Sequence, residues 1–338
     1  MTERPAAFTD LIDLASERAG GSVLLANDEF FAPKEALIKS TAAEWREGVY
    51  NERGKWMDGW ETRRRRTPGY DWCILRLGIP GIIRGVVVDT AFFRGNYPES
   101  CSIEGATVEG TPDAETIAST AKWTEILVRS PLQGDSRNAF PVHNATPFTH
   151  LRLNIFPDGG VARLRVHGEG FFDSGRHHPG SEIDLAAAEH GGQVLLCSDM
   201  FFGHRHNLIM PGRSTYMGDG WETRRRRGPG HDWSIVKLAT RGKLHRVEID
   251  TDHYKGNAPG RCMVEIADAR SVPNAEVQAL AGRMGAWQVI LHETPLQPHT
   301  RHRFTDLVAH GPATHVRLNI YPDGGIARMR VYGMPEPE

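Results

Sequence analysis

The chain has 338 residues, of which 39% are hydrophobic and 24% charged, and its formal net charge is −2 at pH 7. This length suits two domains of roughly 150 residues each. The near-neutral charge argues against nucleic-acid binding, which needs a basic domain or face. We expect no membrane span, because no apolar run approaches the roughly 20 residues that a spanning helix needs. The N-terminus also lacks the apolar core of a signal peptide.

The cysteines favour a reduced protein. Cys73, Cys101, Cys197 and Cys262 are scattered and show no C-x-x-C spacing. Cys101 and Cys262 occupy equivalent positions of an internal repeat, so we expect two buried strand residues and no disulfide between them. The pattern is typical of a cytoplasmic protein.

In chain order, the first half of the sequence returns in the second half. Residues 13–31, "DLASERAGGSVLLANDEFF", correspond to residues 184–202, "DLAAAEHGGQVLLCSDMFF". Residues 149–168, "THLRLNIFPDGGVARLRVHG", correspond to residues 314–333, "THVRLNIYPDGGIARMRVYG". A repeat of this length indicates a duplicated domain, since solenoid periods are nearer 20 to 50 residues.

The repeat predicts three regions along the chain. The first copy with its N-terminal lead spans residues 1–168, a polar glycine-rich linker spans 169–183, and the second copy spans 184–338. The offset between copies falls from 171 at the start to 161 in the middle. The first copy therefore carries about ten extra residues around Thr41 to Gly54.

Each copy is predicted to be rich in β-strands. Apolar and polar residues alternate in "LRLNIF" (151–156), which is the period of a half-buried strand. "PDGG" follows as a turn, and "VARLRV" (161–166) alternates again, which predicts a hairpin. In it, Leu164 and Val166 face the core, while Arg163 and Arg165 face the opposite side.

Other segments complete the fold prediction. "RGVVVDT" and "HRVEIDT" are expected strands that end before a loop containing "GN". Only "AEVQALAGR" and "IDLASER" look briefly helical. Thirty-six glycines and twenty-one prolines indicate many turns. We predict an all-β chain of two tandem, duplicated jelly-roll β-sandwich domains.

One nonamer, "DGWETRRRR", occurs at residues 58–66 and again at 219–227. If the segment is extended, Glu61 and Arg63 share one face. Adjacent arginines repel one another unless carboxylates or an anionic ligand lie among them. A guanidinium matches a carboxylate in two parallel hydrogen bonds, so the motif is a candidate site for a small acid. Solvated ion pairs, worth at most about 1 kcal/mol each, are the alternative explanation for these charges.

Histidines are concentrated in the second copy, where eleven of the sixteen follow Ile183. His231 stands where the first copy has Tyr70, and His253 where it has Phe92. Histidine exchanges protons near neutral pH, so the second copy is better equipped for acid–base chemistry. The pairs His204 with His206 and His299 with His302 are weak candidates for metal ligands.

The blocks "GDGWETRRRR", "IDTDHYKGNAP" and "PLQPHTRHRF" closely resemble the allantoicase family, over nearly the whole chain and in both copies. The resemblance implies two jelly-roll domains similar to galactose-binding modules. It also implies hydrolysis of allantoate to (S)-ureidoglycolate and urea, in the breakdown of purines and allantoin for nitrogen. Some members of the family are associated with divalent manganese, but no set of metal ligands stands out in this sequence.

The chemistry that the resemblance implies suggests roles for the motif residues. Glu222 or Asp232 is the expected base and His231 or His253 the expected acid. Arg224 or Arg63 would hold the substrate carboxylate. The residues expected to contact or orient the substrate are Asp219, Arg224, Arg226, Asp250, Asp58, Glu61 and Arg63. We expect the working site in the second copy or shared between the copies.

Two rival functions are open at this stage. A tandem jelly-roll module without enzymatic activity would bind a sugar or a small anion, with Trp60 and Trp221 stacked on sugar rings. A protein-interaction scaffold would instead show an exposed apolar patch and no charged pocket. The partner expected for an enzyme is the small-molecule substrate, and a homo-oligomer is expected from the general frequency of such assemblies.

Overall fold

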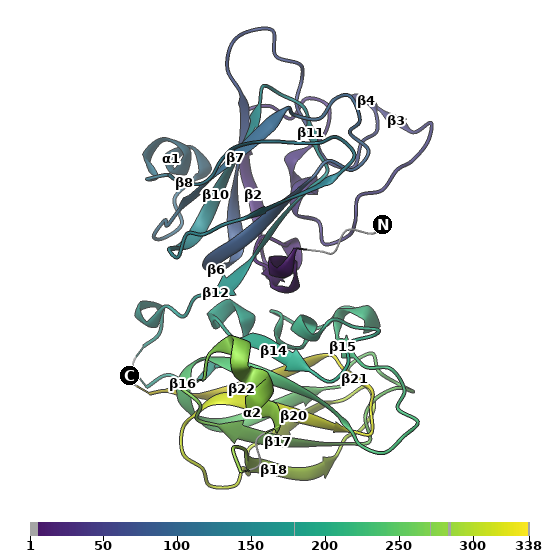
Figure 1. Cartoon of the computed structure of the whole chain (residues 1–338), viewed down its shortest axis with the longest axis vertical. Helices are drawn as coiled ribbons and strands as arrows, with labels where there is room; N and C mark the ends of the chain where they lie inside the picture. The colour runs from purple at the N-terminus through teal and green to yellow at the C-terminus, as the bar shows by residue number, and fades with distance from the viewer. Residues whose placement is uncertain (1–5, 179, 271, 283–284, 337–338) are drawn as a thin grey trace. The chain divides into compact units, whose positions relative to one another are not determined.

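The computed structural model describes residues 6–178, 180–270, 272–282 and 285–336. The chain folds into two compact units, Met1–Phe171 and Phe172–Glu338. In each unit most of the regular secondary structure consists of antiparallel strands (Figure 1). The predicted all-β fold of two tandem copies is confirmed. Within the described ranges, no helix is long and apolar enough to cross a membrane.

The strands of the two units correspond one to one, except for an extra hairpin in the first unit. The first unit contains β1 (Ile12–Asp13), β2 (Ser22–Ala26), β3 (Tyr50–Asn51), β4 (Gly54–Lys55), β5 (Trp60–Glu61), β6 (Asp71–Asp89), β7 (Ser100–Ala106), β8 (Thr124–Pro131), β9 (Arg137–Pro141), β10 (Pro147–Phe156), β11 (Gly160–Val161) and β12 (Arg163–Gly170). The second contains β13 (Ile183–Asp184), β14 (Gln193–Cys197), β15 (Trp221–Glu222), β16 (Asp232–Asp250), β17 (Arg261–Ala267), β18 (Gln288–Pro295), β19 (Arg301–Phe304), β20 (Ala313–Tyr321), β21 (Gly325–Ile326) and β22 (Arg328–Pro335).

Helices are short in both units. The α-helices are α1 (Ala114–Thr120) and α2 (Val277–Gly282). The 3-10 helices are η1 (Ala7–Asp10), η2 (Glu17–Ala19), η3 (Lys34–Ile38), η4 (Ser174–Arg176), η5 (Ala188–His190), η6 (Arg205–Ile209), η7 (Met217–Asp219) and η8 (Asn274–Glu276). The segment "AEVQALAGR" forms η8 and α2, and its last residue, Arg283, lies outside the described residues. "IDLASER" begins as strand β1 and is helical only in η2, so the helical prediction was wrong for its first residues.

In each sandwich, one long strand contributes its first half to one layer and its second half to the other. The first half of β6 pairs with β2 and β10, and its second half pairs with β9 and β12. The same pairing recurs in β16, with β14 and β20 on its first half and β19 and β22 on its second. The strand therefore bends and returns, so that it starts and finishes at the same end of the sandwich.

That shared end carries the repeated motif. Asp71, at the start of β6, lies opposite Ile155, and Asp89, at its finish, lies opposite Arg163. The "PDGG" turn joins these two partners, and β5 pairs with β11 directly after it. We call this the motif end: residues 58–71, 90–98 and 157–160 of the first unit, and 219–232, 251–259 and 322–325 of the second.

The predicted hairpin is wrong in its pairing. β10 and β12 both pair with β6 and not with each other, so the turn crosses from one layer to the other. The predicted core face is confirmed, since Leu164 and Val166 are fully buried. Arg163 lies on the opposite face, as predicted, but its side chain is only 1% exposed because other residues cover that face. Residues 39–58 cover this outer face, and Arg163 donates hydrogen bonds to Asp58 and to the carbonyl of Thr41.

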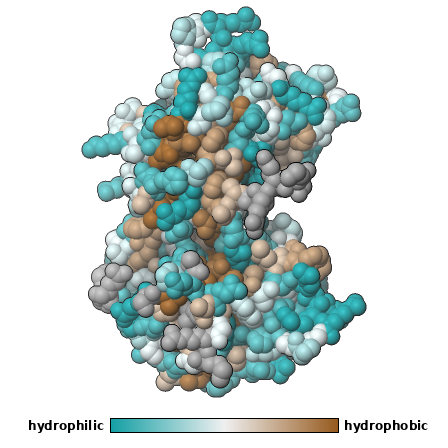
Figure 2. All heavy atoms as spheres, viewed as in Figure 1, coloured by the Kyte–Doolittle hydropathy of each residue, from teal (hydrophilic) through white to brown (hydrophobic). Residues whose placement is uncertain are grey.

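The four cysteines are free thiols, and Cys101 and Cys262 are buried strand residues as predicted. On the face shown in Figure 2, hydrophilic side chains predominate and apolar groups are interspersed among them. Such a surface is ordinary for a protein in contact with water.

Candidate functional site

The motif tryptophans anchor the motif to the core. Trp60 and Trp221 are completely buried. The indole N–H of Trp60 donates a 2.8 Å hydrogen bond to the carbonyl of Asp28, and that of Trp221 donates one of the same length to the carbonyl of Asp199. Neither ring is accessible for stacking, so the sugar-platform reading of these residues is wrong.

The first arginine of each motif is paired with an aspartate of the loop after β2 or β14. Nε of Arg63 lies 2.7 Å from Asp28 and its guanidinium lies over the ring of Phe30. Nε of Arg224 lies 2.9 Å from Asp199, and its guanidinium lies over Phe201. Both arginines are more than 60% exposed, which leaves part of each guanidinium open to solvent.

The third arginine is tied to the buried aspartate that starts the long strand. Arg65 lies 2.6 Å from Asp71, and Arg226 pairs in the same way with Asp232. Asp232 is 1% exposed and also accepts a hydrogen bond from the hydroxyl of Ser198. Through these contacts, Asp232 holds the motif against the start of the long strand.

The second and fourth arginines take no part in these contacts. In the part of the chain that the structure describes, Arg64, Arg66, Arg225 and Arg227 are exposed and make no ion pair or side-chain hydrogen bond. The four arginines of a motif thus do not converge on one point. Aspartates outside the motif relieve the repulsion between its arginines.

Asp58 and Asp219 form buried ion pairs with arginines more than 100 residues away. Asp58 lies 2.6 Å from Arg163, and Asp219 lies 3.1 Å from Arg328. Burial acts to raise the pKa of Asp58, but hydrogen bonds from Arg163 and Lys39 outweigh it and bring that pKa below its ordinary value. These two aspartates, which the sequence offered as substrate contacts, join the motif to β12 and β22.

The motif glutamates have a different environment. Glu61 accepts a 2.7 Å hydrogen bond from the side-chain amide of Asn96, and Glu222 accepts one of 2.5 Å from Asn257. Burial raises the pKa of Glu61, and the hydrogen bond from Asn96 opposes that rise only partly. The sequence reasoning missed both asparagines, although each belongs to the "GN" shared by the two copies.

A pocket adjoins this glutamate–asparagine pair in the first unit. It has a volume of about 430 Å³. Its lining residues are Trp45, Lys55, Met57, Phe92, Arg94, Gly95 and Asn96. Arg63 lies instead on a second, more open pocket of about 600 Å³, together with Asp28 and Arg53. Strand β5 ends at Glu61, so the strand alternation that would place Glu61 and Arg63 on one face does not extend to Arg63.

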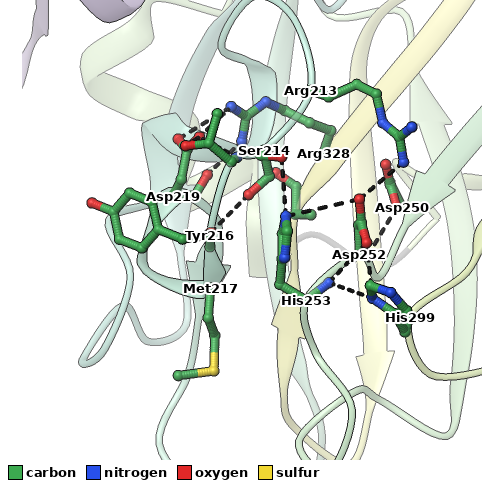
Figure 3. Close-up of polar contacts among 12 residues, drawn as sticks. Arg213, Ser214, Tyr216, Met217, Asp219, Asp250, Asp252, His253, His299 and Arg328 are labelled. Atoms are coloured by element: carbon green, nitrogen blue, oxygen red, sulfur yellow. Dashed lines mark hydrogen bonds and ion pairs between the residues drawn. The ribbon is translucent and has the colours of Figure 1, made fainter.

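In the second unit, the residues after β16 form a polar cluster (Figure 3). Asp252 lies 2.8 Å from Nδ1 of His299 and 2.9 Å from Arg213. Nε2 of His253 lies 3.0 Å from the carbonyl of Ser214. The sequence pointed to His253 but missed Asp252 and Arg213, whose first-copy counterparts carry no charge.

The other residues proposed from the sequence lie at the two ends of β16. Nε2 of His231 lies 2.9 Å from Oδ1 of Asn319, and its ring packs against Tyr321. Asp250 is buried at the finish of the strand and accepts a hydrogen bond from the backbone N–H of Asp252. His231 and Asp232 thus belong to the start of β16, and Asp250 and His253 to its finish.

The described donors do not fit a manganese ion. Among the described residues, no group of three or more His, Cys, Asp or Glu side chains is arranged to hold a metal. The two ring nitrogens of His302 are bound to the carbonyl of Ile249 and the N–H of Gln297. The rings of His204 and His206 lie close together, without a third such ligand among the described residues.

Comparison with known proteins gives consistent results. The family described as the allantoicase repeat matches residues 12–171 and 183–336. A probable allantoicase of Pseudomonas aeruginosa (strain LESB58) is 46% identical, with 99% of each chain covered. Probable allantoicase 1 of Burkholderia mallei is 48% identical over 95% of this chain and 94% of its own. The crystal structure of allantoicase from Saccharomyces cerevisiae superposes with a TM-score of 0.76 at 34% identity, covering 95% of this chain and 92% of that one. The chain belongs to the allantoicase family.

Proposed function

We propose that the chain hydrolyses allantoate to (S)-ureidoglycolate and urea, with the motif glutamates Glu61 and Glu222 as the groups that exchange the proton. One observation carries the assignment of these residues. In both units a partly buried glutamate of the motif is held by an asparagine of the loop after the long strand. In the first unit that asparagine lines a pocket of suitable size for a small ligand.

The reaction breaks the bond between the central carbon of allantoate and one ureido nitrogen. The oxygen of water becomes the hydroxyl of ureidoglycolate, and one proton of water ends on the departing urea nitrogen. A carboxylate can take the proton from water and return it to that nitrogen. Burial raises the pKa of Glu61, which makes its carboxyl a better proton carrier near neutral pH.

The asparagine leaves one glutamate oxygen for the reaction. Asn96 donates to Oε1 of Glu61, and Asn257 donates to Oε1 of Glu222. The carboxylate is thus oriented before substrate binds, which reduces the entropy lost in reaching the transition state. His253 is the second proton-exchanging group that we propose for the second unit. Its side chain is 29% exposed and therefore accessible to a ligand.

The experiment replaces each glutamate by its neutral amide and measures urea and ureidoglycolate released from allantoate. We expect Glu61→Gln and Glu222→Gln each to reduce turnover and the double variant to lose it by about 100-fold or more, as for general acid–base groups. Glu109→Gln, at an exposed position of the first unit, is the matched control. Wild-type turnover in the double variant would remove the assignment of both residues.

Two further properties are proposed with the function. The chain works in the cytoplasm, as four free thiols suit a reducing compartment. It assembles as a homo-oligomer, the commonest kind of soluble oligomer. Light scattering of the purified chain tests the assembly, and a mass equal to one chain would contradict it.

A further inference from the structure

The pocket of the first unit is built partly by residues that the second unit lacks. The backbone N–H of Glu44 donates to Asp58, and the N–H of Thr215 donates to Asp219. These matched contacts place Trp45 at the position of Tyr216. The ten additional residues of the first copy therefore lie between Trp45 and Asp58. Strands β3 and β4 belong to this insertion, and Lys55 at the end of β4 reaches the pocket.

The walls of the pocket combine flat apolar surfaces with a cation. The rings of Trp45 and Phe92 have centroids 5.8 Å apart and an interplanar angle of 32°. Nζ of Lys55 lies 4.3 Å from the centroid of the Trp45 ring. Such contact stabilises an ammonium group without neutralising its charge.

Two cations line this pocket, and they differ in their ion-pair partners. Arg94 pairs with Asp135 at 3.0 Å. Lys55 has no ion-pair partner among the described residues. An ammonium group that lines a pocket and has no ion-pair partner is suited to binding a carboxylate.

We propose that this pocket binds the carboxylate-bearing substrate, with Lys55 taking the carboxylate and the rings of Trp45 and Phe92 packing against a planar ureido arm. The proposal rests on the proposed function, and it names the residues that select the substrate. Because Asn96 uses its amide N–H on Glu61, its carbonyl oxygen is left to accept a hydrogen bond from the ureido N–H. The ligand class is a small carboxylate with flat urea-like groups.

The second unit presents a different surface at the matched position. Tyr216 replaces Trp45, His253 replaces Phe92 and Lys255 replaces Arg94. Phe92 and His253 share a φ of 69°, so their side chains leave the backbone in the same way. The duplication has therefore produced an aromatic version and a histidine version of one site.

Two measurements test the pocket. The first compares KM and kcat for allantoate in Lys55→Met and Trp45→Ala, with Lys122→Met at an exposed position of the same unit as control. We expect Lys55→Met to raise KM about tenfold or more with kcat changed less than threefold, and Trp45→Ala to raise KM also. An unchanged KM in Lys55→Met overturns the proposal.

The second measurement is independent of turnover. Calorimetric titration with (S)-ureidoglycolate is expected to show binding to the wild-type chain and binding about tenfold weaker to Lys55→Met. If Glu61→Gln and Glu222→Gln are inactive while Lys55→Met binds and turns over normally, the pocket proposal fails and the proposed function stands. If the wild-type chain releases no urea from allantoate, the proposed function fails. Equal titration curves for the wild type and Lys55→Met would then overturn the proposed role of the pocket as well.

Discussion

The side-chain amide of Asn96 donates a 2.7 Å hydrogen bond to the carboxylate of Glu61. The loop after β6 reaches the motif because β5 pairs with β11, and the N–H of Gly160 donates to the carbonyl of Asn96. Gly160 is required there, since a Cβ at this position would lie 2.0 Å from the ring of Phe93. The contact that orients the glutamate thus depends on close packing between three separate segments.

Replacing Asn96 by alanine is expected to move the acid limb of the kcat/KM profile to higher pH. The hydrogen bond from Asn96 opposes the effect of burial, so its loss raises the pKa of Glu61 further. Turnover near neutral pH should fall on the order of tenfold, because a hydrogen bond to a charged group contributes about 1.5–3 kcal/mol. Rate profiles of the wild type and of Asn96→Ala measure the effect. A lower rate with an unmoved profile would show that the asparagine does not act through the glutamate.

Asp219→Asn is expected to destabilise the second unit and to leave KM for allantoate unchanged. The substitution removes the carboxylate that pairs with the buried Arg328, and breaking a buried ion pair costs about 3–5 kcal/mol of unfolding free energy. Arg224→Ala, which breaks the more exposed pair with Asp199, is the control and should cost at most about 1 kcal/mol. Urea denaturation measures both changes. A stable Asp219→Asn with a raised KM would instead restore the substrate-binding role suggested by the sequence.

Much of the fold follows from patterns that the sequence displays directly. Alternation in "LRLNIF" identifies β10, and the long repeat identifies two copies of one sandwich. The pairing of β10 and β12 with opposite halves of β6 was not predictable from alternation, because a turn between layers and a hairpin turn can use the same residues. The burial of Arg163 was also hidden, since its partner Asp58 lies 105 positions earlier.

The candidate site was predictable only in outline. The nonamer marks the correct end of each sandwich. Its alternation suggests an extended strand, but in the first unit strand β5 already ends at Glu61. Beyond it, the backbone N–H groups of Arg63 and Arg65 donate to the carboxylates of Asp28 and Asp158 instead of to a neighbouring strand. No periodicity signals such side-chain acceptors. The pocket residue Lys55 lies in the inserted segment, for which the second copy offers no comparison.

Trp221→Phe is expected to reduce stability without a specific effect on substrate binding. Phenylalanine cannot donate to the carbonyl of Asp199, so a partly buried acceptor loses this donor, at a cost of about 1–3 kcal/mol. Thermal unfolding measures the loss, and KM for allantoate should equal that of the wild type. Normal stability together with a raised KM would show that the indole contacts the ligand.

Two buried histidines are expected to make the chain unstable in acid. Burial lowers the pKa of His150 and of His315 to about 4, with smaller contributions from Arg76 and Lys237. The unfolded chain binds protons at these sites near pH 6.5, whereas the folded chain stays neutral there until about pH 4. Between these values the unfolded state holds more protons, so stability falls as the pH falls and is fully present only above about pH 6.5.

The double variant His150→Gln, His315→Gln isolates this effect. It lacks the two titrating rings, so its unfolding free energy should depend less on pH between about 6.5 and 4, by on the order of 3 kcal/mol for each histidine at the acid end. The hydroxyls of Thr149 and Thr314 lie within 2.9 Å of the ring nitrogens of His150 and His315. Glutamine at these positions keeps a side chain that can hydrogen-bond to those hydroxyls. Denaturation curves at a series of pH values give the slopes for both proteins. Parallel slopes for the variant and the wild type would assign the acid lability to other groups, because the buried rings are the only groups that differ.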